Sequence, residues 1–170
     1  MKFHLVDRIE RIEPGKRIIA VKSLSLAEEY LADHFPAFPV MPGVLMLESL
    51  VQTAAWLVRV EQSFSNSMIV LSTARNVRYS NFILPGSLLR SEAELVSING
   101  ELAKFKALGS TGDGATAVQG RLELRCFNVV DVFPPAADAD ARIIAQLKEQ
   151  FKLIGGPAAL AAAGVAWKPD

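Results

Sequence analysis

Apolar and polar residues alternate along most of the chain after residue 66. The alternation has a period of two, which is typical of strands that bury one face of a sheet. It predicts long strands over residues 67–80, 87–98, 101–110 and 116–128. Pro85–Gly86 and Asn99–Gly100, which are turn-forming pairs, separate the first three of these strands. A run rich in β-branched residues predicts one earlier strand, over residues 16–24.

A different pattern lies between the first strand and the later ones. Residues 42–60 open with a Pro-Gly pair and are apolar on nearly all sides of a helix. At about 100° per residue, Glu48, Gln52 and Arg59 fall on one narrow polar line of this helix. A helix that is apolar on nearly all sides must be enclosed, and an antiparallel sheet curled around it does so economically. The pattern therefore predicts an α+β fold with a long central helix.

The two ends of the chain carry weaker patterns. Residues 4–12 place apolar side chains at helical spacing and predict a short helix. Residues 131–140 predict a linker, and residues 138–152 predict an amphipathic helix. Residues 155–170 are rich in glycine, alanine and proline, so we expect a loosely ordered tail there.

Length and composition limit the possible functions. The 170 residues fit one main domain over residues 1–130, followed by a linker, helix and tail over residues 131–170. Lysine plus arginine equals aspartate plus glutamate at 18 each, so the chain lacks the basic excess of nucleic-acid binders. The single cysteine, Cys126, cannot form an internal disulfide. Without a signal-peptide pattern or a membrane-spanning apolar run, we expect a cytoplasmic protein. The chain has no histidine or cysteine cluster for a metal, and we expect no cofactor.

Two residues are candidates for chemistry, His34 and Glu48. Taken alone, each has an ordinary explanation, as an incidental loop histidine and as a carboxylate paired with a cation at the edge of the core. His34 differs from His4 because it opens a segment with three prolines, at 36, 39 and 42, which leads into the central helix. Because so many prolines exclude both a helix interior and a central strand, the sequence predicts a stiff loop for this segment.

The segment from His34 to Gln52 carries a specific resemblance. It reads His-Phe-Pro-Ala-Phe-Pro-Val-Met-Pro-Gly-Val-Leu-Met-Leu-Glu-Ser-Leu-Val-Gln. This resembles the signature of the FabZ-type 3-hydroxyacyl-[acyl-carrier-protein] dehydratases, and weaker similarity extends over residues 5–128. The resemblance implies a hot-dog fold and the dehydration of 3-hydroxyacyl thioesters to enoyl thioesters. It identifies His34 and Glu48 as the catalytic pair, and glutamate favours plain dehydration over added isomerisation.

The resemblance also implies how the site is built. His34 takes the C2 proton of the substrate, and Glu48 gives a proton to the leaving hydroxyl, directly or through a water. Free backbone N–H groups of Gly43 or Val44 at the start of the helix polarise the thioester carbonyl. Gln52, Phe35 and Pro42 are expected to support the site.

The family also indicates assembly and partners. Its paired site residues come from opposite subunits, so we expect a homodimer or a trimer of dimers. The substrate is an acyl thioester on acyl carrier protein or coenzyme A, and an acidic carrier would meet a basic rim among Arg75, Arg78, Arg121 and Arg125. This chain departs from the family at Asp33, where glycine is usual, and an acidic neighbour favours protonated His34.

Two other functions remain open on the sequence. One is a different hot-dog reaction, thioester hydrolysis, which uses a carboxylate and water but does not need the His-Phe-Pro segment. The other is a non-catalytic acyl-binding or dimerisation module with a degenerate site. The intact His34 and Glu48 argue against the second alternative.

Overall fold

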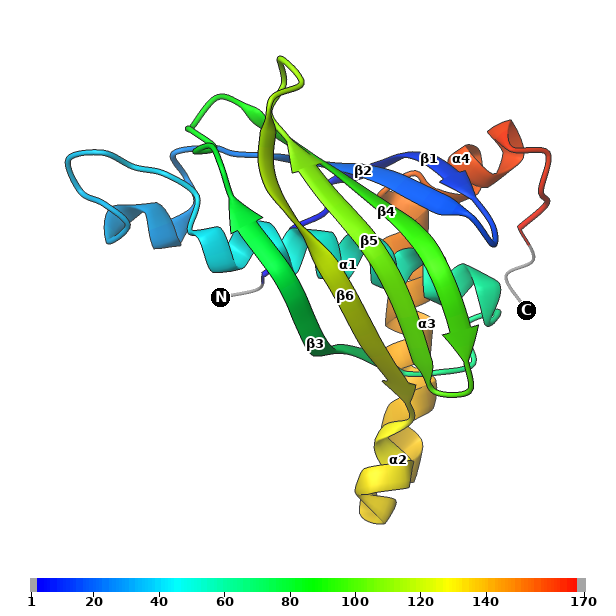
Figure 1. The fold of residues 1–170 in the computed structure, drawn as a ribbon. Helices are drawn as coiled ribbons and strands as arrows, with labels where there is room; N and C mark the ends of the chain where they lie inside the picture. The colour runs from blue at the N-terminus through cyan, green and yellow to red at the C-terminus, as the bar shows by residue number, and fades with distance from the viewer. Residues whose placement is uncertain (1–2, 168–170) are drawn as a thin grey trace.

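An antiparallel sheet curls around one long helix in this protein (Figure 1). This computed structural model describes residues 3–167, and it describes residues 136 and 137 by their backbone alone. The first two residues of the predicted main domain and the last three of the predicted tail therefore lie outside the described residues. The sheet runs in the order β1-β2-β4-β5-β6-β3. Its strands are β1 (Arg8–Glu13), β2 (Arg17–Ser23), β3 (Met68–Tyr79), β4 (Leu88–Asn99), β5 (Leu102–Ser110) and β6 (Thr116–Phe127).

The helices are the central helix and a C-terminal group. They are α1 (Gly43–Glu61), α2 (Val129–Val132), α3 (Ala137–Leu153) and α4 (Gly156–Ala162), with 3₁₀ turns at Glu29–Ala32 and Pro134–Ala136. The α+β fold, the central helix, the five predicted strands and the amphipathic C-terminal helix are therefore confirmed, with boundaries shifted by a residue or two.

β5 turns one row of side chains toward the core and the other toward the surface. Along β5, Ala103, Phe105 and Ala107 are buried, while the lysines between them are exposed. Gly109 continues the inner row, and a Cβ atom there would lie 2.7 Å from a Val118 methyl carbon. No side chain larger than hydrogen fits at this position, so the glycine lets β5 approach its neighbours closely.

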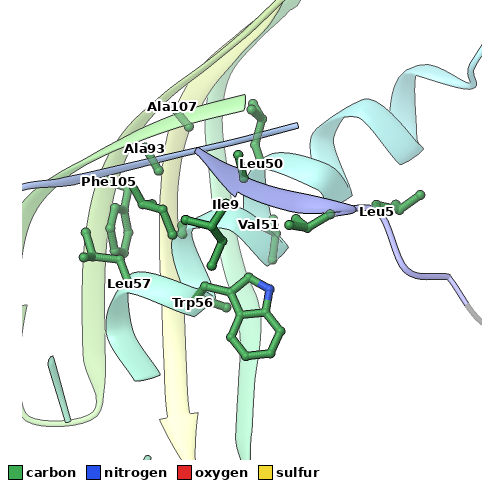
Figure 2. Packing of buried hydrophobic residues seen from close by; sticks show 14 of the residues in the cluster. Leu5, Ile9, Leu50, Val51, Trp56, Leu57, Ala93, Phe105 and Ala107 are labelled. Carbon is green, nitrogen blue, oxygen red and sulfur yellow. The ribbon is translucent and has the colours of Figure 1, made fainter. Parts of the chain in front are cut away.

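The core forms between α1 and this inner face (Figure 2). Leu50 and Leu57 of α1 are completely buried, and Phe105 of β5 packs into the same cluster. By length and composition α1 would be able to cross a membrane, but 56% of the relevant window is buried inside the protein. Enclosure by the sheet accounts for the apolar character of this helix.

The prediction of a helix over residues 4–12 is wrong, because residues 8–13 form β1. Ile9 and Ile12 are both buried although they are three residues apart. The pairing of β1 with β2 shifts register between Ile9 and Arg11. Such a bulge inserts one extra residue and returns the next apolar side chain to the same face. The bulge therefore imitates helical spacing in the sequence.

The expectation of a loosely ordered tail over residues 155–170 is also wrong for its first half. Residues 156–162 form α4, which packs on β1 through Ala159 and Leu160. The N–H of Ile9 in β1 donates to the carbonyl of Ile154, at 2.8 Å. Small side chains let this helix lie close to the sheet, so the alanine-rich composition reflects tight packing here. Residues 168–170 of the predicted tail lie outside the described residues.

Candidate active site

The proline-rich loop holds His34 by several backbone hydrogen bonds. The N–H of His34 donates to the Tyr30 carbonyl at 3.2 Å, and the N–H of Val40 donates to the His34 carbonyl at 3.1 Å. Met41 then donates to the carbonyl of Ile83, at 3.0 Å, on the segment between β3 and β4. These hydrogen bonds hold the loop at both ends, in agreement with the stiff loop that its prolines predict.

The ring of His34 is also oriented. Its Nδ1 lies 3.0 Å from the Val40 carbonyl oxygen, and its plane stacks on the ring of Phe35 with centroids 4.3 Å apart. A carbonyl oxygen only accepts, so Nδ1 carries the proton and donates. In the neutral ring Nε2 is then left with a free lone pair. His34 is partly buried and Phe35 is more than half exposed.

The start of α1 places two backbone donors beside this loop. Pro42 is the N-cap of α1, and its carbonyl accepts from the N–H groups of residues 45 and 46. The N–H groups of Gly43 and Val44 come before these and have no acceptor within the helix. The ring of Tyr79 lies over Gly43, where an added Cβ atom would meet it at 3.1 Å. Tyr79, which the sequence analysis did not select, therefore lies beside a predicted site residue.

Glu48 is fixed by Gln52, which lies one helical turn later on the same face of α1. The Gln52 Nε2 donates to Glu48 Oε1 at 3.0 Å and to the Phe3 carbonyl at 3.0 Å. The Gln52 Oε1 accepts from the N–H of Leu5, also at 3.0 Å. These contacts determine which way the amide points, and within residues 3–167 no hydrogen bond reaches Glu48 Oε2. The role of residues 3–5 in this arrangement has no signal in the sequence.

The structure joins some predicted site residues and separates others. It brings Glu48 into contact with Gln52 and aligns Pro42 with Gly43 and Val44 at the helix start. Within residues 3–167, no hydrogen bond or ion pair links His34 to Glu48.

Glu48 lines a cavity of about 250 Å³ between α1 and α3. The walls of this cavity, called here the Glu48 cavity, come from the N-terminal segment, α1, the start of β3 and α3. The lining residues are Phe3, His4, Glu48, Val51, Gln52, Ala55, Trp56, Arg59, Ile69, Leu147 and Gln150. A larger hollow of about 940 Å³ runs along α3, but neither His34 nor Glu48 lines it.

Comparison with solved structures defines the class of fold. The chain resembles the dehydratase heterocomplex ApeI:P from Xenorhabdus doucetiae with a TM-score of 0.64 at 18% identity, covering 79% of this chain and 90% of that one. It also resembles a mutant thioesterase from Pseudomonas aeruginosa with a TM-score of 0.56 at 12% identity, covering 71% and 80%. The fold is the hot-dog fold, as expected.

Comparison of sequences defines the family. Residues 1–121 match the model of the FabA-like domain. The chain is 36% identical over 121 residues to the 3-hydroxyacyl-[acyl-carrier-protein] dehydratase FabZ of Ruminiclostridium cellulolyticum, covering 71% of this chain and 84% of that protein. The FabZ of Exiguobacterium sibiricum is 37% identical over 120 residues, with 71% and 85% covered. The chain therefore belongs to the FabA-like family.

Proposed function

We propose that this protein is an enzyme that dehydrates 3-hydroxyacyl thioesters to trans-2-enoyl thioesters in the synthesis of fatty acids or related acyl chains. The observation that carries the proposal is the family match over residues 1–121, which includes both His34 and Glu48. The names of the two bacterial relatives, both dehydratases, point to the same reaction.

His34 acts as the base in this proposal. Because the Val40 carbonyl holds Nδ1 in its protonated form, Nε2 is the atom that takes a proton. It removes the proton from C2 of the substrate, and the electron pair of the C–H bond forms the C2=C3 double bond. The free N–H groups of Gly43 and Val44 stabilise the charge that develops on the thioester oxygen.

Glu48 acts as the acid. Its Oε2 delivers a proton to the C3 hydroxyl, directly or through a water, as the C–O bond breaks and water leaves. The hydrogen bond from Gln52 to Oε1 keeps the carboxyl group in one orientation. Transfer of the proton from His34 back to Glu48 through solvent restores the starting state. No metal or cofactor is needed for this sequence of steps.

The active enzyme is a homodimer, or a trimer of dimers, with His34 and Glu48 of each site supplied by different subunits. The missing contact between them within one chain supports this arrangement. So does β3, which is an edge strand of the sheet with one unpaired side. Large apolar side chains are also exposed around the loop and the helix start, namely Phe35, Phe38, Val44, Phe82 and Leu84.

The acyl carrier is an acyl carrier protein. Arg75 of β3 lies opposite Arg121 of β6, which lies opposite Lys106 of β5, and none of the three has an ion-pair or hydrogen-bond partner in residues 3–167. They surround a hollow of about 400 Å³ that suits an acidic protein. Arg125, by contrast, pairs with Glu101 at 3.2 Å. The enzyme works in the cytoplasm, where such carriers are loaded.

The direct test uses purified protein with 3-hydroxyacyl thioesters of acyl carrier protein and of coenzyme A, followed by detection of enoyl product. His34→Ala and Glu48→Gln should each abolish turnover without changing the circular dichroism spectrum. Glu94→Gln, which neutralises an exposed carboxylate on β4, is the matched control and should keep full activity. Activity retained in either site variant would contradict the assigned roles.

Two further readouts test the arrangement. Mixing the two inactive variants should restore part of the activity, because one site of each hybrid dimer is then intact. No recovery on mixing, with subunit exchange demonstrated, would contradict the shared site. Release of free thiol without enoyl product would instead indicate thioester hydrolysis.

A further inference from the structure

Arg59 is a cation at the end of the Glu48 cavity that is distant from Glu48. It lies on the last turn of α1, and its guanidinium group sits over the indole ring of Trp56, 5.0 Å from the ring centroid. Its Nε atom is buried and has no hydrogen-bond partner. Burial lowers the pKa of Arg59 to about 10, so the side chain is still charged at neutral pH.

This cation has no partner within the described residues 3–167. Gln52 and Gln150, the amide side chains of the same cavity, already make hydrogen bonds to the N-terminal segment and to His4. Glu48 is eleven residues earlier on the helix, about 16 Å along its axis, and makes no ion pair with Arg59. The indole face offers only partial compensation for the lost hydration. Arg59 therefore presents unused N–H donors to the cavity.

Between Glu48 and Arg59, apolar side chains line part of the cavity wall on both helices. Val51, Ala55 and Trp56 line it from α1, and Leu147 closes it from α3. α3 lies outside the family match, which ends at residue 121. The C-terminal part of this chain thus adds a wall to a cavity that runs from a proposed catalytic acid to an unpaired arginine.

We infer that Arg59 is a specificity-determining residue that binds a carboxylate at the far end of the acyl chain, so that the preferred substrate is an ω-carboxylated 3-hydroxyacyl thioester. This inference rests on the proposed dehydratase function. A planar carboxylate matches the paired N–H donors of a guanidinium group, which a methyl end leaves unused. The side chains of Val51, Ala55 and Leu147 offer apolar contacts to the methylene chain between the thioester and the carboxylate.

The test compares 3-hydroxyacyl thioesters of equal length that end in a methyl group or in a carboxylate, over a series of lengths. We expect kcat/KM of the wild-type protein to be at least about tenfold higher for the carboxylate series at its best length. Arg59→Met should lower kcat/KM for that series about 10- to 100-fold, the value of a hydrogen bond between charged groups, and spare the methyl series. Arg59→Lys should fall between the two.

Arg142→Met is the matched control, because it removes an exposed arginine of α3 that does not line the Glu48 cavity. It should leave the ratio between the two substrate series unchanged. Equal kcat/KM for both series in the wild-type protein would overturn the inference, and so would a ratio that Arg59→Met does not change. Dissociation of the Arg59→Met dimer with equal loss on both series would also overturn it, since Arg59 would then serve the subunit interface.

A binding measurement separates this inference from the proposed function. Trp56 and Trp167 are the two tryptophans of the chain, so Trp167→Phe leaves the indole beneath Arg59 as the sole reporter. Saturated thioesters with carboxylate ends should change its fluorescence at concentrations about tenfold lower than methyl-ended ones. If this preference depends on Arg59 while no thioester is dehydrated, the proposed function fails and only the binding of a carboxylate by Arg59 stands. If dehydration proceeds but the preference for carboxylate ends is absent, the inference fails and the proposed function stands.

Discussion

Replacing Phe151 with alanine tests whether the C-terminal helices belong to the main core. Phe151 of α3 is completely buried, and its ring lies 5.8 Å from Trp56 of α1 and 5.5 Å from Phe64. A buried phenylalanine removes about 200 Å² from water. At about 25 cal/mol per Å², burial of this area contributes about 5 kcal/mol to the free energy of unfolding, and an alanine side chain retains part of that contribution. We therefore expect a loss of about 4 kcal/mol, inside the usual range for such truncations.

Urea unfolding at fixed protein concentration, followed by circular dichroism and by tryptophan fluorescence, measures this loss. With a slope of about 2 kcal/mol per M, the midpoint should fall by about 2 M and the slope should stay constant. Both signals should move together, because α3 packs on α1. A midpoint shift below about 0.5 M, or a separate early transition in the circular dichroism, would refute the reasoning.

Gly156 provides an independent check on the same contact. A Cβ atom at Gly156 would lie 2.3 Å from the ring of Phe151, so Gly156→Ala should cost about 1–3 kcal/mol through overpacking. Gly112→Ala is the control, since nothing lies within 4 Å of a Cβ atom there. In the Phe151→Ala background the cost at Gly156 should disappear, and strict additivity of the two changes would contradict the proposed contact.

Three other predictions concern individual side chains. Gln52→Leu should lower kcat about 10- to 100-fold by releasing Glu48, with unchanged circular dichroism. Cys126 should react with a thiol reagent only on unfolding, because burial raises the pKa of its thiol; rapid labelling of the native protein would contradict this. The hydrogen bond from Ser67 lowers the pKa of Asp140. Ionised Asp140 therefore stabilises the fold at a pH above its ordinary pKa, and this stabilisation is lost as the pH falls through the lowered pKa. Asp140→Asn should accordingly lower Tm at pH 7, with a smaller difference in acid.

The sequence predicted best those elements whose environment is simple. β5 alternates between buried and exposed positions along its whole length, so a period of two describes it. α1 carries an apolar run that is long for a strand and opens with a Pro-Gly pair, and these features mark it as a helix. β1 was mistaken for a helix because its bulge places Ile9 and Ile12 at helical spacing. A bulge depends on the pairing of two strands, and no single segment of sequence contains that information.

The sequence likewise predicts only part of the candidate site. His34, Glu48, Gly43 and Val44 come from one continuous segment, and their roles stay predictions because no hydrogen bond or ion pair joins His34 to Glu48 within residues 3–167. Tyr79 reaches the start of α1 from the end of β3, which only the folded sheet shows. The boundary predicted after residue 130 also stays a prediction.

The three polar residues on the face of α1 differ in how their hydrogen-bonding groups are used. The Gln52 side chain accepts a hydrogen bond from Leu5 and donates to Phe3 and Glu48, which suits a residue that positions Glu48. Glu48 Oε2 makes no hydrogen bond within residues 3–167, which suits the acid role proposed for it. Arg59 keeps a buried Nε that has no hydrogen-bond partner within residues 3–167. Since unpaired buried polar groups destabilise a fold, a cation kept in this state on a core helix is best explained by a partner that arrives from outside the chain.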